Sequence, residues 1–134
     1  MVCALLLSAA PLFSQNKTNM STYPFKITES NGEYDIAAEI ESEELSAKYA
    51  QVFEKHGYSG NGYCWEGHII QILEKTDKNL LRHIDFDPEA GFFFAYADSQ
   101  KAQQRFIEIL SPIFSDLKKL EAYILSADRD RIDD

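Results

Sequence analysis

The sequence predicts an α+β domain in which two antiparallel β-hairpins form a sheet covered by helices, in the order ββααββα(α). Each predicted hairpin consists of two short segments, either apolar or alternating in polarity, that are connected by a turn-forming sequence. Apolar residues recur at helical spacing between and after these hairpins. The 134 residues, 45% of them hydrophobic, suit one domain with one core. Because a lone hairpin is marginally stable in water, helices are expected on its apolar side.

The first hairpin and the first two helices follow one another directly. Residues 24–29 and 33–40 predict strands that flank a Ser-Asn-Gly turn. Ser42 is placed to cap the first helix, and Gly57 is placed to end it. After a Gly-rich loop, helical spacing of apolar residues predicts a second helix over residues 65–75.

The second hairpin is expected from residues 80–87, which alternate in polarity, and from the apolar residues 92–97. A helix capped by Asp98 or Ser99 should follow it. Pro112 then suits either a kink or a fresh helix start capped by the preceding serine.

The two ends of the chain are expected to lie outside the domain proper, residues 20–127. Residues 128–134 alternate in charge and should fray. Residues 1–19 open with an apolar run too short to span a bilayer, so no stable membrane insertion is expected. This run resembles a secretory leader without its basic start. The protein is periplasmic or exported if residues 1–14 are a leader, and cytoplasmic if translation begins at Met20.

The composition is acidic, with 13 Lys and Arg against 22 Asp and Glu, a net charge of −9. This charge repels phosphate backbones, so nucleic acid is a poor candidate partner. It favours a basic protein partner, or it serves solubility alone. The Gly-Asn-Gly stretch at residues 60–62 has neither the Walker nor the dinucleotide spacing, so a tight turn and no cofactor are expected.

Two groups of side chains could support chemistry. His83, Asp85 and Asp87 alternate on one predicted strand face, where carboxylates could bind a hard cation, although a solvated outer face is the favoured interpretation. Cys64 lies near His68 in the sequence and could form a Cys–His nucleophile pair, although a packed thiol is favoured. No metal site and no catalytic set is therefore predicted.

Residues 56–66, His-Gly-Tyr-Ser-Gly-Asn-Gly-Tyr-Cys-Trp-Glu, resemble the signature of the Immunity protein 51 family. Its members are small bacterial proteins of polymorphic toxin systems, where each is thought to neutralise a cognate toxin. The family pattern of Gly-Tyr, Gly-x-Gly and Trp-Glu is matched here, whereas Cys64 stands where a polar residue is expected. Residues 83–92 are similar to the second half of the family, and the resemblance covers roughly residues 25–125.

The resemblance implies a protein that is not an enzyme and that binds a toxin, occluding its active site or substrate-binding surface. An acidic surface would speed association with a basic toxin. The candidate partner-binding residues are Tyr58, Asn61, Tyr63, Trp65, Glu66, Asp85, Asp87 and Glu89. We expect the exposed members of this set to make the contacts, with Trp65 in the core by default. The alternatives are a small metal- or thiol-dependent enzyme, or an exported accessory domain without a toxin partner.

Overall fold

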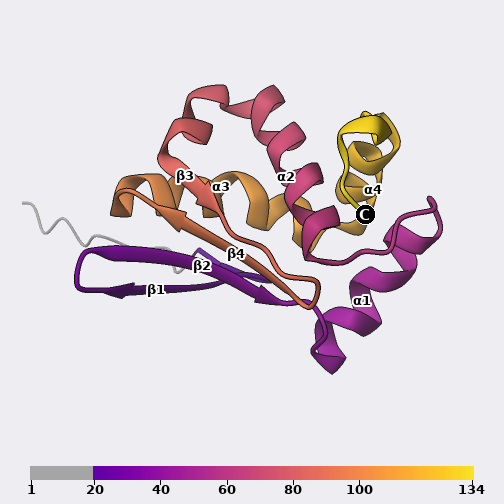
Figure 1. Ribbon diagram of the computed structural model, residues 1–134, viewed down its shortest axis with the longest axis horizontal. Coiled ribbons are helices and arrows are strands. Elements are labelled where there is room, and N and C mark those ends of the chain that lie inside the picture. Colours follow the sequence, from indigo (N-terminus) through magenta and orange to yellow (C-terminus); the bar gives the residue numbers. More distant parts are fainter. Residues whose placement is uncertain (1–19) are drawn as a thin grey trace, which may run out of the picture.

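A computed structural model describes residues 20–134, which form a four-stranded antiparallel sheet with helices packed on one of its faces (Figure 1). The strands lie in the order β1-β2-β4-β3. Their bounds are Lys26–Ser30 (β1), Glu33–Glu39 (β2), Ile84–Phe86 (β3) and Phe92–Ala97 (β4). The leader-like segment, residues 1–19, lies outside the described residues.

The helices complete the predicted α+β class, in the order ββααββαα. Their bounds are Glu43–Glu54 (α1), Gly62–Thr76 (α2), Gln100–Ser115 (α3) and Leu117–Ser126 (α4), with 3₁₀ helices at Lys78–His83 (η1) and Arg129–Arg131 (η2). None of the helices within residues 20–134 combines the length and the apolar character needed to cross a membrane.

Local sequence rules account for most of the chain reversals and helix starts. Asn31 and Gly32 both have positive φ, 52° and 79°, as a two-residue hairpin turn of the Asn-Gly kind requires. The Ser42 and Ser99 hydroxyls accept hydrogen bonds from backbone N–H groups three residues later, and so cap α1 and α3. These predictions are confirmed.

The predicted strand over residues 80–87 is wrong in its first half. Lys78–His83 forms η1, and β3 begins only at Ile84. In a strand, Leu80 and Arg82 would point to the same face, yet Leu80 is buried and Arg82 is exposed. The 3₁₀ winding lets the leucine enter the core while the arginine reaches water.

Of the two alternatives predicted at Pro112, a kink or a fresh helix start, the fresh start is wrong, because α3 runs through this residue to Ser115. The Ser111 hydroxyl does not cap a helix. It donates to the backbone carbonyl oxygen of Tyr23 at 2.6 Å, and so fastens the start of the domain to α3. The break comes at Asp116, whose carboxylate caps α4.

Trp65 lies at the centre of the core and is fully buried. Its ring centroid is 6.3 Å from that of Phe25 ahead of β1, 5.1 Å from Tyr49 on α1 and 4.8 Å from Phe114 on α3. Edge-to-face and tilted ring pairs of this kind stabilise a core beyond the burial of area alone. One indole therefore joins three parts of the chain to α2.

The first residue of α2, Gly62, lies directly against the turn of the β3–β4 hairpin. Its N–H donates to the carbonyl oxygen of Ala90 at 2.9 Å. A Cβ atom at this position would come within 1.8 Å of the carbonyl oxygen of Glu89 and 2.3 Å of that of Phe92. Only glycine fits here, so this contact sets where α2 begins relative to the hairpin.

The tail over residues 128–134, expected to fray, is instead docked along α2, and we call it the C-terminal strap. Gln71 exchanges two hydrogen bonds with the backbone of Asp128, at 2.8 and 3.0 Å. Arg131 forms an ion pair with Glu74. The strap is thus held on α2 by hydrogen bonds to the backbone of Asp128 and by the ion pair of Arg131.

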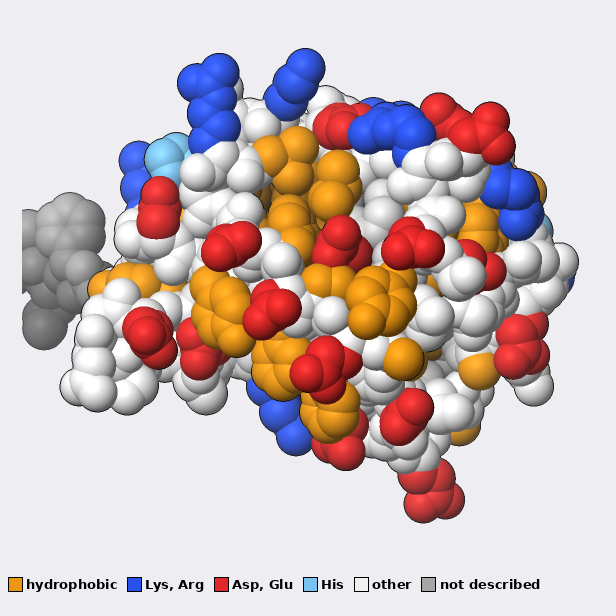
Figure 2. Space-filling view, viewed as in Figure 1, with side chains coloured by type: hydrophobic (Ala, Val, Ile, Leu, Met, Phe, Trp, Pro, Cys, Tyr) orange, Lys and Arg blue, Asp and Glu red, His pale blue; other side chains and the backbone are white. Residues whose placement is uncertain are grey.

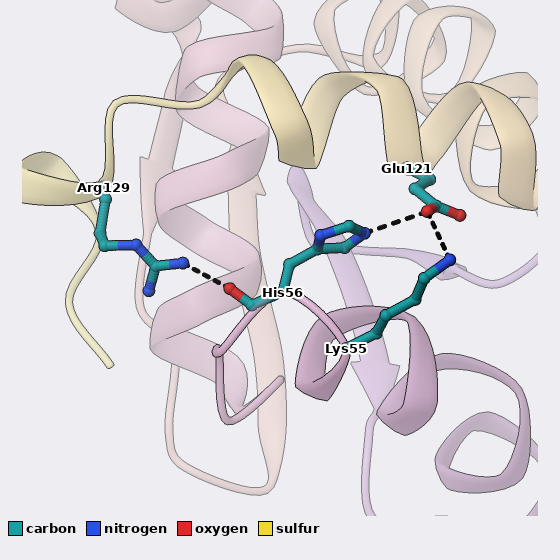
Figure 3. A network of polar contacts seen from close by, with 4 residues as sticks. All are labelled: Lys55, His56, Glu121 and Arg129. Atoms are coloured by element: carbon teal, nitrogen blue, oxygen red, sulfur yellow. Dashed lines mark hydrogen bonds and ion pairs between the residues drawn. The ribbon is translucent and has the colours of Figure 1, made fainter.

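Arg129 of the strap also closes the loop that follows α1 (Figure 3). Its guanidinium donates to the carbonyl oxygen of His56 and lies over the Tyr58 ring, 4.1 Å from the centroid. On the other side, Lys55 Nζ and His56 Nε2 lie 2.8 and 3.1 Å from the Glu121 carboxylate of α4. The loop is therefore held by both the strap and α4.

We predict that Gly62→Ala lowers the free energy of unfolding by about 3 kcal/mol, because the new Cβ meets backbone oxygens that cannot move independently. Urea unfolding followed by circular dichroism measures this change. Tyr63→Ala, at the next and exposed position, is the control and should change stability by no more than about 0.5 kcal/mol. Equal midpoints for the two variants would contradict the steric argument.

Candidate partner-binding surface

The side of the sheet opposite the helices exposes a row of aromatic residues on its central strand, β4. The alternate residues of β4 point into the core, whereas Phe92, Phe94 and Tyr96 point to the other side. The Phe92 and Phe94 rings stack with centroids 5.5 Å apart, and Tyr96 is 38% exposed. Among residues 20–134, no helix lies over this side (Figure 1).

Carboxylates flank the aromatic row on both sides. β2 contributes Glu33, Asp35 and Glu39, and the β3 side of the hairpin contributes Asp85, Asp87 and Glu89. The strand register places Tyr96 between Asp35 and Asp85, for example. We call these six carboxylates and the three rings the acidic aromatic face. Figure 2 shows hydrophobic and acidic side chains interleaved over the strands.

The electrostatic character of this face is strongly negative. Desolvation, and then the charges of neighbouring carboxylates, of which Asp87 and Asp35 come first, raise the pKa of Tyr96. Among the described strand residues on this side, Lys26 on the edge strand is the one basic side chain. A partner that covers the face must therefore supply positive charge.

The start of α2 meets one end of the acidic aromatic face. Because Gly62 packs on the hairpin turn, its sequence neighbours Asn61 and Tyr63 lie close to Glu89 in space. Tyr63 is 40% exposed, whereas the Asn61 side chain accepts from the Cys64 N–H and caps α2. Of the first half of the predicted site, Asn61 and Tyr63 are thus brought to the end of the hairpin that carries Glu89, although the two segments are far apart in sequence.

Three other predicted partner-binding residues lie elsewhere. Trp65 is fully buried, and Tyr58 is 5% exposed beneath the Arg129 guanidinium. Both side chains therefore support the loop from inside the protein. For Trp65 this agrees with the expectation that it lies in the core. Glu66 is half-buried, and desolvation followed by the charge of Asp133 raises its pKa. It lies beside the strap.

Sequence reasoning missed the aromatic row because residues 92–97 are apolar at every position. Such a run is typical of a strand buried on both faces. A usable signal was the short turn at residues 90 and 91, which aligns Phe94 with Asp87. Since paired residues share a face, this register predicts that Phe94 lies on the side already assigned to the carboxylates.

The structure does not arrange the predicted cation-binding row as a strand of three ligands. His83 lies in η1 rather than in β3, and its Nδ1 is 2.7 Å from the Asp98 carboxylate. Within residues 20–134, no group of three or more His, Cys, Asp or Glu side chains is arranged to hold a metal ion. The carboxylates are better described as part of the acidic aromatic face.

The Cys64–His68 pair is inside the core. The thiol sulfur is 3.5 Å from His68 Nδ1, but the same nitrogen is 2.8 Å from the Cys64 carbonyl oxygen. Because that oxygen can only accept, Nδ1 carries a proton and cannot act as a base toward the thiol. Burial raises the pKa of Cys64 to about 12 and lowers the pKa of His68. Both groups are neutral at pH 7, which is typical of packing rather than of nucleophilic catalysis.

Comparison with known proteins identifies one family. The sequence profile of Immunity protein 51 matches residues 25–129, most of the chain. The match includes all four strands and the start of α2. No curated protein and no solved structure matches the chain.

We predict that Cys64 in a Cys3→Ser chain reacts with a thiol reagent at neutral pH roughly a hundredfold more slowly when native than when unfolded in urea, because the thiolate is the reactive form. The absorbance of the released leaving group measures the rate. A cysteine introduced at the exposed Ser46 is the control and should react rapidly in the native protein. Rapid native labelling of Cys64 would revive the thiol-enzyme hypothesis.

Proposed function

Because the chain belongs to the Immunity protein 51 family, we propose that it is an immunity protein that binds a cognate bacterial toxin and neutralises it by occlusion. The bound protein would cover the toxin's active site or its substrate-binding surface. The observation that carries this proposal is the acidic aromatic face, where an exposed Tyr96 and the half-buried rings of Phe92 and Phe94 lie among carboxylates on the uncovered side of the sheet.

The face has the composition of a binding surface. Aromatic residues are enriched among the residues that carry binding energy at protein interfaces. Here they lie on β4, which is hydrogen-bonded to β2 on one side and to β3 on the other. A surface held this way loses little conformational entropy when a partner binds, so more of the contact energy is available for affinity.

The carboxylates add a long-range attraction for a basic toxin. Complementary charge accelerates the encounter between two proteins and suppresses wrong partners. Asp85, Asp87 and Glu89 lie beside the rings, and Tyr63 with Asn61 extends the contact at the start of α2. The exposed Tyr63, Asp85, Asp87 and Glu89, together with the half-buried Asn61, are our proposed toxin contacts, with Glu66 at the margin.

The test is a rescue experiment. The toxic C-terminal domain encoded upstream of this gene, where one is present, is expressed in a test bacterium with and without residues 20–134. We expect growth to be restored and the two proteins to purify together. The full chain, tested with the toxin directed to the periplasm, shows which compartment is relevant. Absence of rescue and of a complex, with both proteins folded in one compartment, would refute the proposal for that pair.

We predict that the double variant Asp85→Asn with Asp87→Asn slows association with the toxin by about tenfold at low salt and less at high salt, because exposed charges act mainly on the encounter rate. Surface plasmon resonance measures the rate. The double variant Glu43→Gln with Glu54→Gln removes the same charge from exposed positions of α1 and serves as the control. Identical rates for the two variants would remove these carboxylates from the site.

A further inference from the structure

Resting on the proposed function, we propose that the acidic aromatic face docks into a nucleic-acid-binding groove of the toxin and takes the place of a single strand there. The protein would then neutralise the toxin by competing with its polymeric substrate. The geometry of the rows, the chemistry that any partner must supply and the exclusion of other occupants all support this assignment.

The rings and carboxylates of the acidic aromatic face repeat at regular intervals, as the bases and phosphates of a nucleic acid strand do. Successive side chains on one side of a strand are roughly 6.7 Å apart, and neighbouring strands are about 4.8 Å apart. The rings of Phe92, Phe94 and Tyr96 therefore form a regular central line. Phe92 and Tyr96 each have a carboxylate on both flanks, and Phe94 has Asp87 on one flank and Ala37 on the other. A nucleic acid strand likewise offers flat rings beside regularly spaced negative charge.

The partner's chemistry follows from this pattern. Opposite the carboxylates it must place Lys or Arg, and opposite the rings it must place planar groups, either aromatic side chains or guanidinium groups. A positively charged groove with aromatic side chains along it is the arrangement that proteins use to bind single-stranded nucleic acid. Such a groove offers both the positive charges and the planar groups that the acidic aromatic face requires.

Other occupants fit the face less well. A second copy of this chain also has a net charge of −9, so its acidic face would oppose like charge. An uncharged apolar surface would bury the carboxylates without partners, at high cost in free energy. Nucleic acid itself would be repelled. A cationic groove satisfies both the rings and the carboxylates.

The experiment uses the toxin domain that co-purifies in the rescue assay, inactivated in its catalytic site, with fluorescein-labelled single-stranded DNA and RNA oligonucleotides as probes. We expect the toxin to bind an oligonucleotide and the full-length protein to displace it, which returns the fluorescence anisotropy to the value of the free probe. Phe94→Ser and the variant Asp85→Asn with Asp87→Asn should each need about a tenfold higher concentration for displacement.

The α1 control, Glu43→Gln with Glu54→Gln, should displace the probe as the wild type does, and thermal unfolding verifies that each variant is folded. A ternary complex of toxin, oligonucleotide and protein would overturn the inference while leaving the immunity function intact. So would a toxin that binds the protein but neither oligonucleotide. Failure to form any toxin complex would instead refute the proposed function, on which the inference rests.

Discussion

The burial of Trp65 is the constraint on which the other layers depend. Its indole is in ring contact with Phe25 ahead of the sheet, Tyr49 on α1 and Phe114 on α3, so α2 is the element that the rest of the chain packs around. Aromatic pairs have preferred angles as well as distances, and a cluster of them therefore orients helices rather than only attracting them. With the indole seated, α2 can be displaced only by breaking contacts with three separate parts of the chain.

The orientation of α2 in turn fixes the position of the β3–β4 hairpin through Gly62, which lies one helical turn before Trp65. The absence of a side chain there allows the backbone of α2 to touch the carbonyl oxygens of the β3–β4 hairpin. The core and the acidic aromatic face are consequently connected: the ring cluster orients α2, and the start of α2 supports the hairpin whose β4 carries the aromatic row. The surface that we propose for toxin binding therefore depends on packing beneath it.

Features governed by neighbours in sequence could be predicted, such as the Asn31–Gly32 turn, the Ser42 cap and the helical stripes. Features governed by distant contacts could not. Leu80 lies in a 3₁₀ helix instead of the predicted strand, since this conformation buries its side chain in the core. The strap docks because Arg129 packs on the ring of Tyr58, which is distant in sequence. Of the six carboxylates of the candidate site, Asp85, Asp87 and Glu89 were among the predicted partner-binding residues, whereas the three on β2 were not. The rings beside them were missed because register, which sets the face of Phe94, depends on pairing between strands.

The C-terminal strap has a consequence for the order in which the fold can assemble during synthesis. Residues 128–134 are synthesised after Gln71 and Glu74 on α2 and after Tyr58, yet they bind the first two residues and cover the third. A nascent chain in which the strap has not yet emerged from the ribosome must therefore hold α2 with this flank open to water. The strap then docks on elements that all precede it in the chain.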